Sequence, residues 1–300
     1  MNFGYILTDG LELGLLFSFL ALGVFISFRV LDFADLSAEG TIVLGSSVMA
    51  NLMMKDQNIY FTLIVVILSG FVAGVITGIL HTKLKIPPIL AGIIVMTGLY
   101  SVNLRILGTS NISLGGIDNI FSPFRTLINN PFLAKALALI IIVMVIYLFL
   151  YLLFGTEIGM SIRATGMDKK MAKAQGINTD LMVILGLGIS NAIIALGGGL
   201  IAQYNNVANL SMGKGTIVIG LASIIIGEAI FGKRTFKVWL ISVIFGSVIY
   251  QTLIGLAISL GLNTNDLQLV QAILIAIILA TPVIKDKFFS KEVLAYDKTT

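Results

Sequence analysis

Long apolar runs alternate with short polar segments along the chain. Nine such runs stand out, at about 11–28, 38–54, 60–80, 87–107, 132–155, 181–204, 216–231, 238–260 and 268–284. A helix needs roughly 20 mostly apolar residues to cross the hydrocarbon core of a bilayer. The pattern therefore predicts an all-α polytopic membrane protein with about eight to ten transmembrane helices.

Two of the runs are short and polar at one end. We expect residues 38–54 and 216–231 to be half-helices or re-entrant segments, which membranes tolerate where they line a cavity rather than face lipid. In the third run, Gly70, Gly74 and Gly78 recur at a spacing of four. This spacing puts them on one helix face and predicts the close approach of another helix.

A phrase of about twelve residues occurs twice. ADLSAEGTIVLG covers 34–45, and ANLSMGKGTIVIG covers 208–220 with one extra residue. An odd number of predicted crossings separates the two copies, so they would point in opposite directions. We therefore expect one transmembrane domain, 1–300, with an inverted internal repeat, a common plan of transporters. Its halves would be about 11–107 and 181–284; the alternative is chance similarity between apolar segments.

Composition excludes several classes of protein. Hydrophobic residues make up 57% of the chain and charged residues 11%, against about 25% charged in a soluble domain. There is no cysteine and a single histidine, His81, so no metal-ligand set or thiol nucleophile is available for an intramembrane enzyme. The net charge of +4 is small and gives no reason to expect nucleic-acid binding.

Lysine and arginine are distributed unevenly between alternate loops. With the N-terminus outside, 14 of the 19 fall on the inner side and 5 on the outer side. The positive-inside rule then predicts a multi-pass protein with a cytoplasmic C-terminus. Residues 108–131 would face outside and 156–180 the cytoplasm. Residues 1–10 carry no Lys or Arg, which argues against a cleavable signal peptide.

The charged loop 156–180 contains a predicted short helix. Asp168 is a suitable N-cap, and Gly176 marks the end of the helix. Met171 and Ala174 give the segment an apolar side, while its lysines stay polar. Such a helix suits docking into a groove on a partner protein. The alternative is a helix that lies on the bilayer surface.

Some ionisable residues lie in or beside apolar runs. Glu228 could form a structural ion pair or take part in transport, because a charge near a membrane segment is costly and often functional. Asp32, Asp35 and Glu39 cluster beside Arg29. They could form a solvated entrance, or a cation or acid–base site. Glu228 or this cluster would serve the alternative function, a secondary transporter driven by an ion gradient.

Polar side chains of the repeated phrase and the sixth run are candidates for a translocation path, although interhelical hydrogen bonding is an equally good explanation. The selected path residues are Asp35, Ser37, Asn191, Asn209 and Ser211. The stretch GEAIFGKR, 227–234, nearly matches a phosphate-binding P-loop. Arg234 stands where the motif needs Ser or Thr, so we do not expect the chain to bind ATP itself.

The chain resembles the branched-chain amino acid and ribose type of ABC-importer permease. The resemblance rests on GLELGLLFSFLALGVFISFRVLDFADLSAEG, GMSIRATGMDKKMAKAQGINTD and GLASIIIGEAIFGKRTF. It extends over almost the whole chain, and the loop is its specific part, with matches at Arg163, Ala164, Gly166, Ala172, Gly176 and Ile177. At 32–36 the chain reads DFADL where branched-chain permeases typically have Asn-Phe-Ala-His-Gly. In this segment the chain resembles an offshoot of the permease family that is associated with aromatic or other amino acids.

The resemblance implies a transport subunit rather than an enzyme, which needs no cofactor because a partner subunit binds ATP. The implied solute is small and polar, an amino acid delivered by an external substrate-binding lipoprotein or periplasmic protein. The implied partners are cytoplasmic ABC ATPase subunits and a second permease copy, identical or related, in a bacterial inner membrane. The residues implied to couple the ATPase to the pore are Arg163, Gly166, Asp168, Met171, Ala172, Ala174 and Gly176.

Overall fold

A computed structural model describes residues 3–117, 119–127 and 130–260, together with positions 269, 272–273 and 276. The described part is almost entirely helical. Its elements are α1 (Phe3–Val24), η1 (Phe25–Val30), α2 (Ala38–Met53), α3 (Ile59–Thr82), α4 (Pro88–Leu107), β1 (Asn111–Ser113), α5 (Ser122–Leu127), α6 (Pro131–Gly155), α7 (Glu157–Met167), α8 (Lys169–Ala174), α9 (Thr179–Asn205), β2 (Val207–Asn209), α10 (Thr216–Phe231) and α11 (Phe236–Ser259).

Six helical segments are long and apolar enough to cross a membrane. They correspond to the first, third, fourth, fifth, sixth and eighth apolar runs, which confirms the all-α polytopic membrane fold. The second and seventh runs form the shorter helices α2 and α10, of 16 residues each. The ninth run, 268–284, falls almost wholly outside the described residues.

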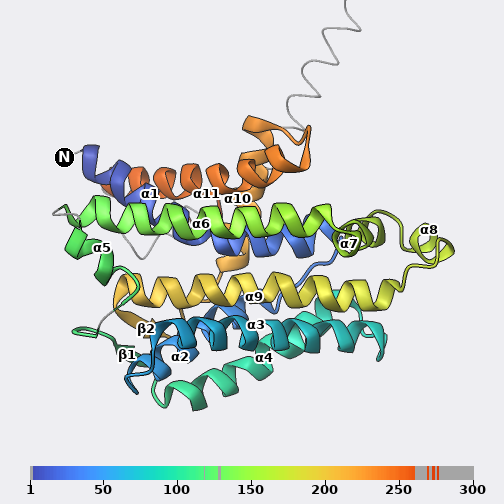
Figure 1. The fold of residues 1–300 in the computed structure, drawn as a ribbon, viewed down its shortest axis with the longest axis horizontal. Helices are drawn as coiled ribbons and strands as arrows, with labels where there is room; N and C mark the ends of the chain where they lie inside the picture. The colour runs from blue at the N-terminus through green and yellow to red at the C-terminus, as the bar shows by residue number, and fades with distance from the viewer. Residues whose placement is uncertain are drawn as a thin grey trace, which may run out of the picture.

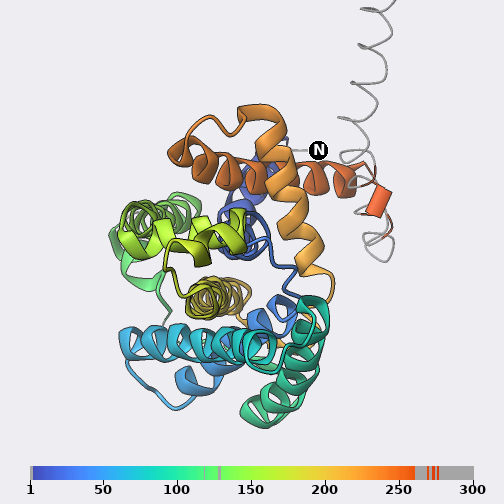
Figure 2. The same cartoon turned by 90° about the vertical axis from the view of Figure 1, so that its right-hand side faces the viewer.

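Helices α1 and α9 form the centre of the bundle, and the other long helices surround them (Figures 1 and 2). The two are antiparallel, since Gly23 of α1 contacts Ser190 and Ile194, while Gly197 contacts Phe19. A hydrogen bond joins them where Ser190 Oγ donates to the Gly23 carbonyl at 2.7 Å. Such serine contacts are a common way for helices to associate in membranes.

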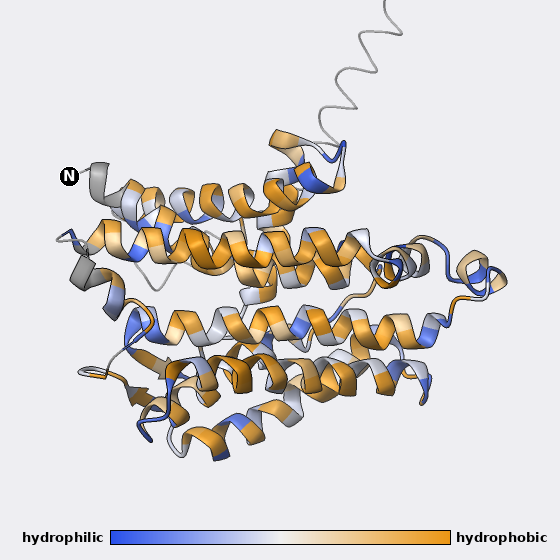
Figure 3. Ribbon diagram, viewed as in Figure 1, coloured by the Kyte–Doolittle hydropathy of each residue, from blue (hydrophilic) through white to orange (hydrophobic). Residues whose placement is uncertain are grey.

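The outer helices present apolar faces to the surroundings. Apolar residues are spread along α3, α4 and α6 on both sides of the bundle (Figure 3). Large exposed side chains on them include Ile64, Leu68, Ile94 and Met144. A soluble monomer rarely exposes such continuous apolar surface, so these faces suit contact with lipid or with another membrane subunit.

The glycine pattern of α3 serves close packing, as the sequence predicts. A methyl group at Gly74 would overlap the Leu187 carbonyl of α9, and one at Gly78 would meet the Ile184 backbone. Gly70 lies in the same way against Asn191. Without side chains at these positions, the backbones of α3 and α9 come together closely.

The two ends of the bundle are built differently. Strands β1 and β2 pair antiparallel, with Asn111 opposite Asn209, at one end. Helices α7 and α8 lie at the opposite end (Figure 1). We call these the sheet end and the loop end. The predicted outer segment 108–131 and inner segment 156–180 thus lie at opposite ends of the molecule.

Both short helices follow a chain reversal. After α1, the π-helical segment η1 leads into an irregular stretch, 31–37, and α2 begins near the middle of α9, where Ser37 Oγ lies 3.3 Å from Asn191 Oδ1. After α9 and β2, residues 210–215 lead into α10, which crosses the long helices at a steep angle (Figure 1). Because α1 and α9 are antiparallel, the two copies of the phrase enter from opposite ends, as an inverted repeat requires.

Candidate functional site

The first copy of the repeated phrase forms a buried polar turn. Asp35 Oδ1 accepts hydrogen bonds from the Ser37 amide at 2.9 Å and the Ser37 hydroxyl at 2.5 Å. Asp35 Oδ2 accepts a third from Asn191 Nδ2 of α9 at 2.8 Å. Asp35 is 3% exposed, and Ser37 and Asn191 are fully buried. The turn therefore fixes the start of α2 to the middle of α9.

The second copy forms the same turn in a different environment. Asn209 Oδ1 accepts from the Ser211 amide at 2.6 Å and from the Ser211 hydroxyl at 2.7 Å. Asn209 is part of β2 at the sheet end, and Ser211 is exposed. The structure thus brings three of the five predicted path residues together in one buried cluster, and it keeps Asn209 and Ser211 apart from them.

The predicted acidic cluster is not a cluster in space. Asp32 is exposed, Asp35 is bound to Ser37 and Asn191, and Glu39 accepts a hydrogen bond from the Gly215 amide at 3.0 Å. A solvated entrance is therefore wrong for Asp35, because burial against α9 removes it from water. Within the described residues, no group of three His, Asp or Glu side chains could hold a metal ion.

The start of α2 meets the start of α10 beside a mainly apolar pocket of about 250 Å³ that also has polar residues in its lining. Glu39 Oε1 accepts from the backbone of Gly215, the N-cap of α10, and Gly213 packs against the Glu39 carbonyl. The polar residues lining the pocket are Glu39, Thr97, Tyr100, Asn103 and Lys214.

Sequence reasoning missed four of these five polar residues as site residues. Lys214 stands directly before the Gly-Thr-Ile-Val of the second copy, where the first copy has Glu39, so aligning the two copies on those four residues would have singled it out. The other three, Thr97, Tyr100 and Asn103, lie on α4 at a spacing of three, which places them on one helix face. Their partners on α2 and before α10 lie far away in the sequence, so the face alone did not identify a site.

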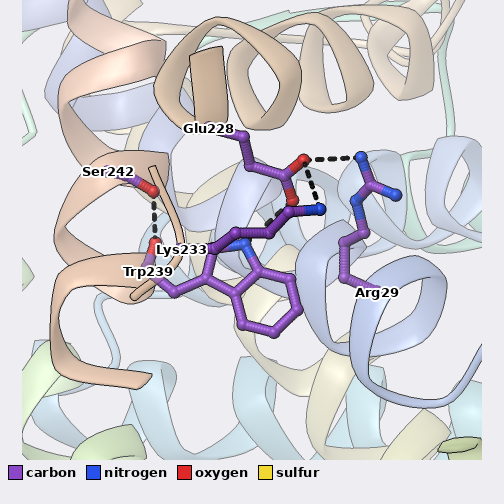
Figure 4. A network of polar contacts seen from close by, with 5 residues as sticks. All are labelled: Arg29, Glu228, Lys233, Trp239 and Ser242. Carbon is purple, nitrogen blue, oxygen red and sulfur yellow. Dashed lines mark hydrogen bonds and ion pairs between the residues drawn. The ribbon is translucent and has the colours of Figure 1, made fainter. Parts of the chain in front are cut away.

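Glu228 is held in an ion-pair network at the C-terminal end of α10 (Figure 4). Its Oε2 lies 2.7 Å from Arg29 Nη2 and 3.9 Å from Lys233 Nζ, and its Oε1 accepts from Trp239 Nε1 at 2.8 Å. Arg29 belongs to η1, which follows α1, so the network joins the two halves of the chain. The structure confirms the predicted ion pair and identifies Arg29 as its nearer partner.

The charged loop contains two helices, of which the sequence predicted the second. Asp168 caps α8 as expected, because its Oδ1 accepts from the amides of Lys170 at 2.8 Å and Met171 at 3.0 Å. Gly176, with φ of 84°, ends the segment in the left-handed conformation. Helix α7 was not predicted; its signal is the N-cap Thr156, whose Oγ1 accepts from the Gly159 amide at 3.3 Å.

The predicted coupling residues face two ways. Arg163 lies over the Phe236 ring at 4.8 Å, and a methyl group at Gly166 would overlap the Val30 carbonyl. Ala172 is also buried. Asp168, Met171, Ala174 and Gly176 are exposed. One part of the set thus packs against the bundle, and the other part forms the free surface of the loop end.

A helical bundle with two interrupted segments and polar turns at membrane depth has the architecture of a solute transporter. The family of branched-chain amino acid transport system permease components matches residues 6–281. The chain therefore belongs to this family of multi-pass membrane permeases, and it is a permease subunit for small solutes.

Relatives with named functions cover most of the chain. It is 43% identical to a tyrosine transport system permease protein of Clostridioides difficile, over 89% of this chain and 88% of the relative. It is 28% identical to a galactofuranose transporter permease of Escherichia coli, over 88% and 76%. It is 23% identical to a ribose import permease of Haemophilus influenzae, over 87% and 78%. No solved structure matches the chain.

Proposed function

We propose that the chain is the permease subunit of an ATP-driven importer that moves an amino acid across a bacterial inner membrane. ATP is hydrolysed by separate ABC ATPase subunits, the permease works beside a second copy, and an external binding protein delivers the solute. The observation that carries this proposal is the structure of the loop end. There, α7 and α8 combine an exposed apolar surface with a buried contact against the end of η1.

The outer surface of this segment suits a protein partner. Met167 is 87% exposed and Met171 is 61% exposed, and both flank the Asp168 cap of α8. Unbranched, polarisable methionine side chains adapt well to a partner groove. Charged Lys169, Lys170 and Lys173 surround them, which is the pattern of a docking helix in water. We assign this surface to the ATPase subunit.

The inner surface links the loop to the first polar turn. Gly166 of α7 lies against Val30 and Leu31, the residues at which η1 ends. Four residues later, Asp35 is bonded to Ser37 and Asn191. A movement of α7 would therefore reach the start of α2 through a short stretch of backbone. This link supports the assignment of Arg163 and Gly166 to coupling.

The solute assignment rests on the relatives and on the fold. The tyrosine permease has the highest identity of the relatives described above, and the sugar permeases match at lower identity. We place the solute path beside the first polar turn and the junction of α2 with α10. The rival, an ion-gradient carrier using Glu228, is less favoured because both carboxylate oxygens of Glu228 already bind Arg29 and Trp239.

Met171→Asp tests the coupling surface. It would bury a charge in the docking groove, and an unpaired buried charge costs about 3–5 kcal/mol. We expect the purified complex, reconstituted with its ATPase and binding protein, to lose solute-stimulated ATP hydrolysis or to dissociate. Met171→Leu is the matched control, since it keeps the apolar contact and should retain both assembly and ATP hydrolysis.

Glu228→Ala tests the rival carrier in the same preparation. A gradient-driven carrier that uses Glu228 should lose proton-coupled uptake, whereas an importer should keep responding to ATP when the gradient is collapsed. Unchanged ATP-dependent uptake in Met171→Asp, together with its loss in Glu228→Ala, would overturn the coupling assignment. Uptake that follows the ion gradient and ignores ATP would overturn the importer itself.

A further inference from the structure

The two copies of the repeated phrase place opposite charges into one pocket. Glu39 directly precedes Gly-Thr-Ile-Val in the first copy, and Lys214 directly precedes it in the second. Although they lie far apart in sequence, both line the pocket at the junction of α2 and α10. Among the described residues, neither side chain has an ion-pair partner within 4.0 Å. The pocket therefore holds a negative and a positive group without counter-ions of their own, although the Glu39 carboxylate also accepts the Gly215 amide.

The α2 and α4 walls of this pocket lie near the middle of the long helices. Gly40, next to Glu39, packs against Met96 and Leu99, close to the middle of the 20-residue helix α4. Ser37, one turn earlier, lies beside the middle of α9. Charged side chains at this depth are not stable against hydrocarbon, and they occur where they face a water-filled cavity or another protein surface. The pocket must therefore open to an aqueous path rather than to lipid.

A buried polar atom in the pocket also lacks a partner. Asn103 is 1% exposed and lines the pocket, and its Nδ2 donates to the Gly40 carbonyl at 3.1 Å. Its Oδ1 has no hydrogen-bond donor. A buried acceptor left unsatisfied is destabilising, so this oxygen is available to a donor that enters the cavity.

We propose that this pocket binds the charged ends of a zwitterionic amino acid on its way through the permease. Glu39 and the Asn103 carbonyl oxygen receive the ammonium group. Lys214 binds the carboxylate, helped by the positive end of α10, whose N-cap Gly215 lies beside Glu39. A volume of about 250 Å³ leaves room for a side chain along Tyr100 of α4. The inference rests on the proposed import function and assigns it a zwitterion rather than a neutral sugar.

The test measures ATP-driven uptake by the reconstituted complex with three probes, L-tyrosine, L-leucine and D-ribose. Glu39→Gln keeps an oxygen that accepts the Gly215 amide but removes the charge, and Lys214→Met removes the opposite charge. Because a hydrogen bond to a charged group is worth roughly a 10- to 100-fold change, we expect kcat/KM for the amino acid to fall by about that factor in each variant. Lys55→Met, an exposed lysine outside the pocket, is the matched control and should transport like the wild type.

A second readout separates recognition from folding. Tyramine lacks the carboxylate and 4-hydroxyphenylpropionate lacks the ammonium group, and both are added as competitors of L-tyrosine uptake. Glu39→Gln should lose its preference for the amine-bearing competitor, and Lys214→Met its preference for the acid, which a merely unstable variant would not do. Wild-type amino acid uptake in Glu39→Gln, or transport of D-ribose alone, would overturn this inference and leave the importer intact. A complex that moves none of the probes with ATP would overturn both.

Discussion

The two polar turns have the same local structure and opposite environments. Asp35 with Ser37, and Asn209 with Ser211, form matching pairs of side-chain hydrogen bonds. The first turn is buried against Asn191 of α9, whereas Ser211 of the second is exposed. Sequence similarity thus sets the turn, and the partner helix decides whether water reaches it.

The difference in burial suggests that the two turns have different roles during transport. The first turn is tied to the centre of the bundle and, through Gly166, to the loop end. The second precedes α10, whose far end is tied to η1 by Arg29 and Glu228. The Glu39–Gly215 hydrogen bond joins the two short helices at their starts. A movement that begins at the loop end can therefore reach α10 through residues of the first copy, through the Glu228 network, or through α11, whose Phe236 lies under Arg163 of α7.

Replacing the hydrogen-bond acceptor of each turn by alanine should give the largest difference in stability between the two copies of the phrase. Asp35→Ala leaves Ser37 and Asn191 buried without their partner, at about 1–3 kcal/mol for each unsatisfied group. Asn209→Ala removes hydrogen bonds whose donor Ser211 can turn to water, at about 0.5–1.5 kcal/mol. Thermal unfolding of the purified variants in detergent measures the difference.

Asp35→Asn is the matched control for Asp35→Ala and Asn209→Ala, because it gives the first copy the residue that the second copy has at the same position. Asparagine keeps an oxygen for Ser37 but turns an amide nitrogen toward Asn191 Nδ2, so that hydrogen bond is lost. Its unfolding temperature should therefore lie between those of wild type and Asp35→Ala. Equal losses in Asp35→Ala and Asn209→Ala would mean that burial does not distinguish the turns.

The last glycine of each phrase gives a second, smaller contrast. Gly45 of α2 faces α9, where a methyl group would overlap the Ala195 carbonyl. Gly220 of α10 holds the equivalent place, and a methyl group there would come within 3.0 Å of the Val24 side chain, which can shift. Overpacking against rigid backbone costs about 1–3 kcal/mol, so Gly45→Ala should lower the unfolding temperature more than Gly220→Ala. The reverse order would show that α2 is not held against α9.

Much of the fold could be predicted from the sequence because it depends on local properties. Run length identified the long helices and the two short ones, and glycine spacing identified the face of α3. Asp168 and Gly176 marked the ends of a helix by their own capping chemistry. The repeated phrase predicted two equivalent turns, and the hydrogen bonds at Ser37 and Ser211 confirm that equivalence.

The rest depended on contacts between distant segments. Arg29 and Glu228 are 199 positions apart. The residues around either one give no indication that the other is its partner. The pocket joins Glu39 to Asn103 and Lys214 from three separate segments. Reading Asp32, Asp35 and Glu39 as one cluster failed because a turn and a helix start send neighbouring side chains in different directions.

Cysteine labelling tests the difference in exposure between the two turns with little change in stability. The native chain contains no cysteine, so only the introduced one can react. Ser211→Cys should react with a water-soluble maleimide in detergent about as fast as an exposed thiol. Position 37 is fully buried, so a cysteine there should react only when the turn opens. An opening free energy of about 3 kcal/mol would slow labelling of Ser37→Cys roughly 100-fold. Denaturant should abolish the difference.

Lys169→Cys, exposed on α8, completes the labelling experiment as a test of sidedness. If the positive-inside orientation holds, an impermeant reagent should leave this cysteine unmodified in intact cells and modify it after the cells are lysed. Ser211→Cys, next to the sheet end, should react from outside. Modification of Lys169→Cys in intact cells would reverse the orientation, while equal labelling of Ser37→Cys and Ser211→Cys in detergent would remove the difference between a buried turn and an open one.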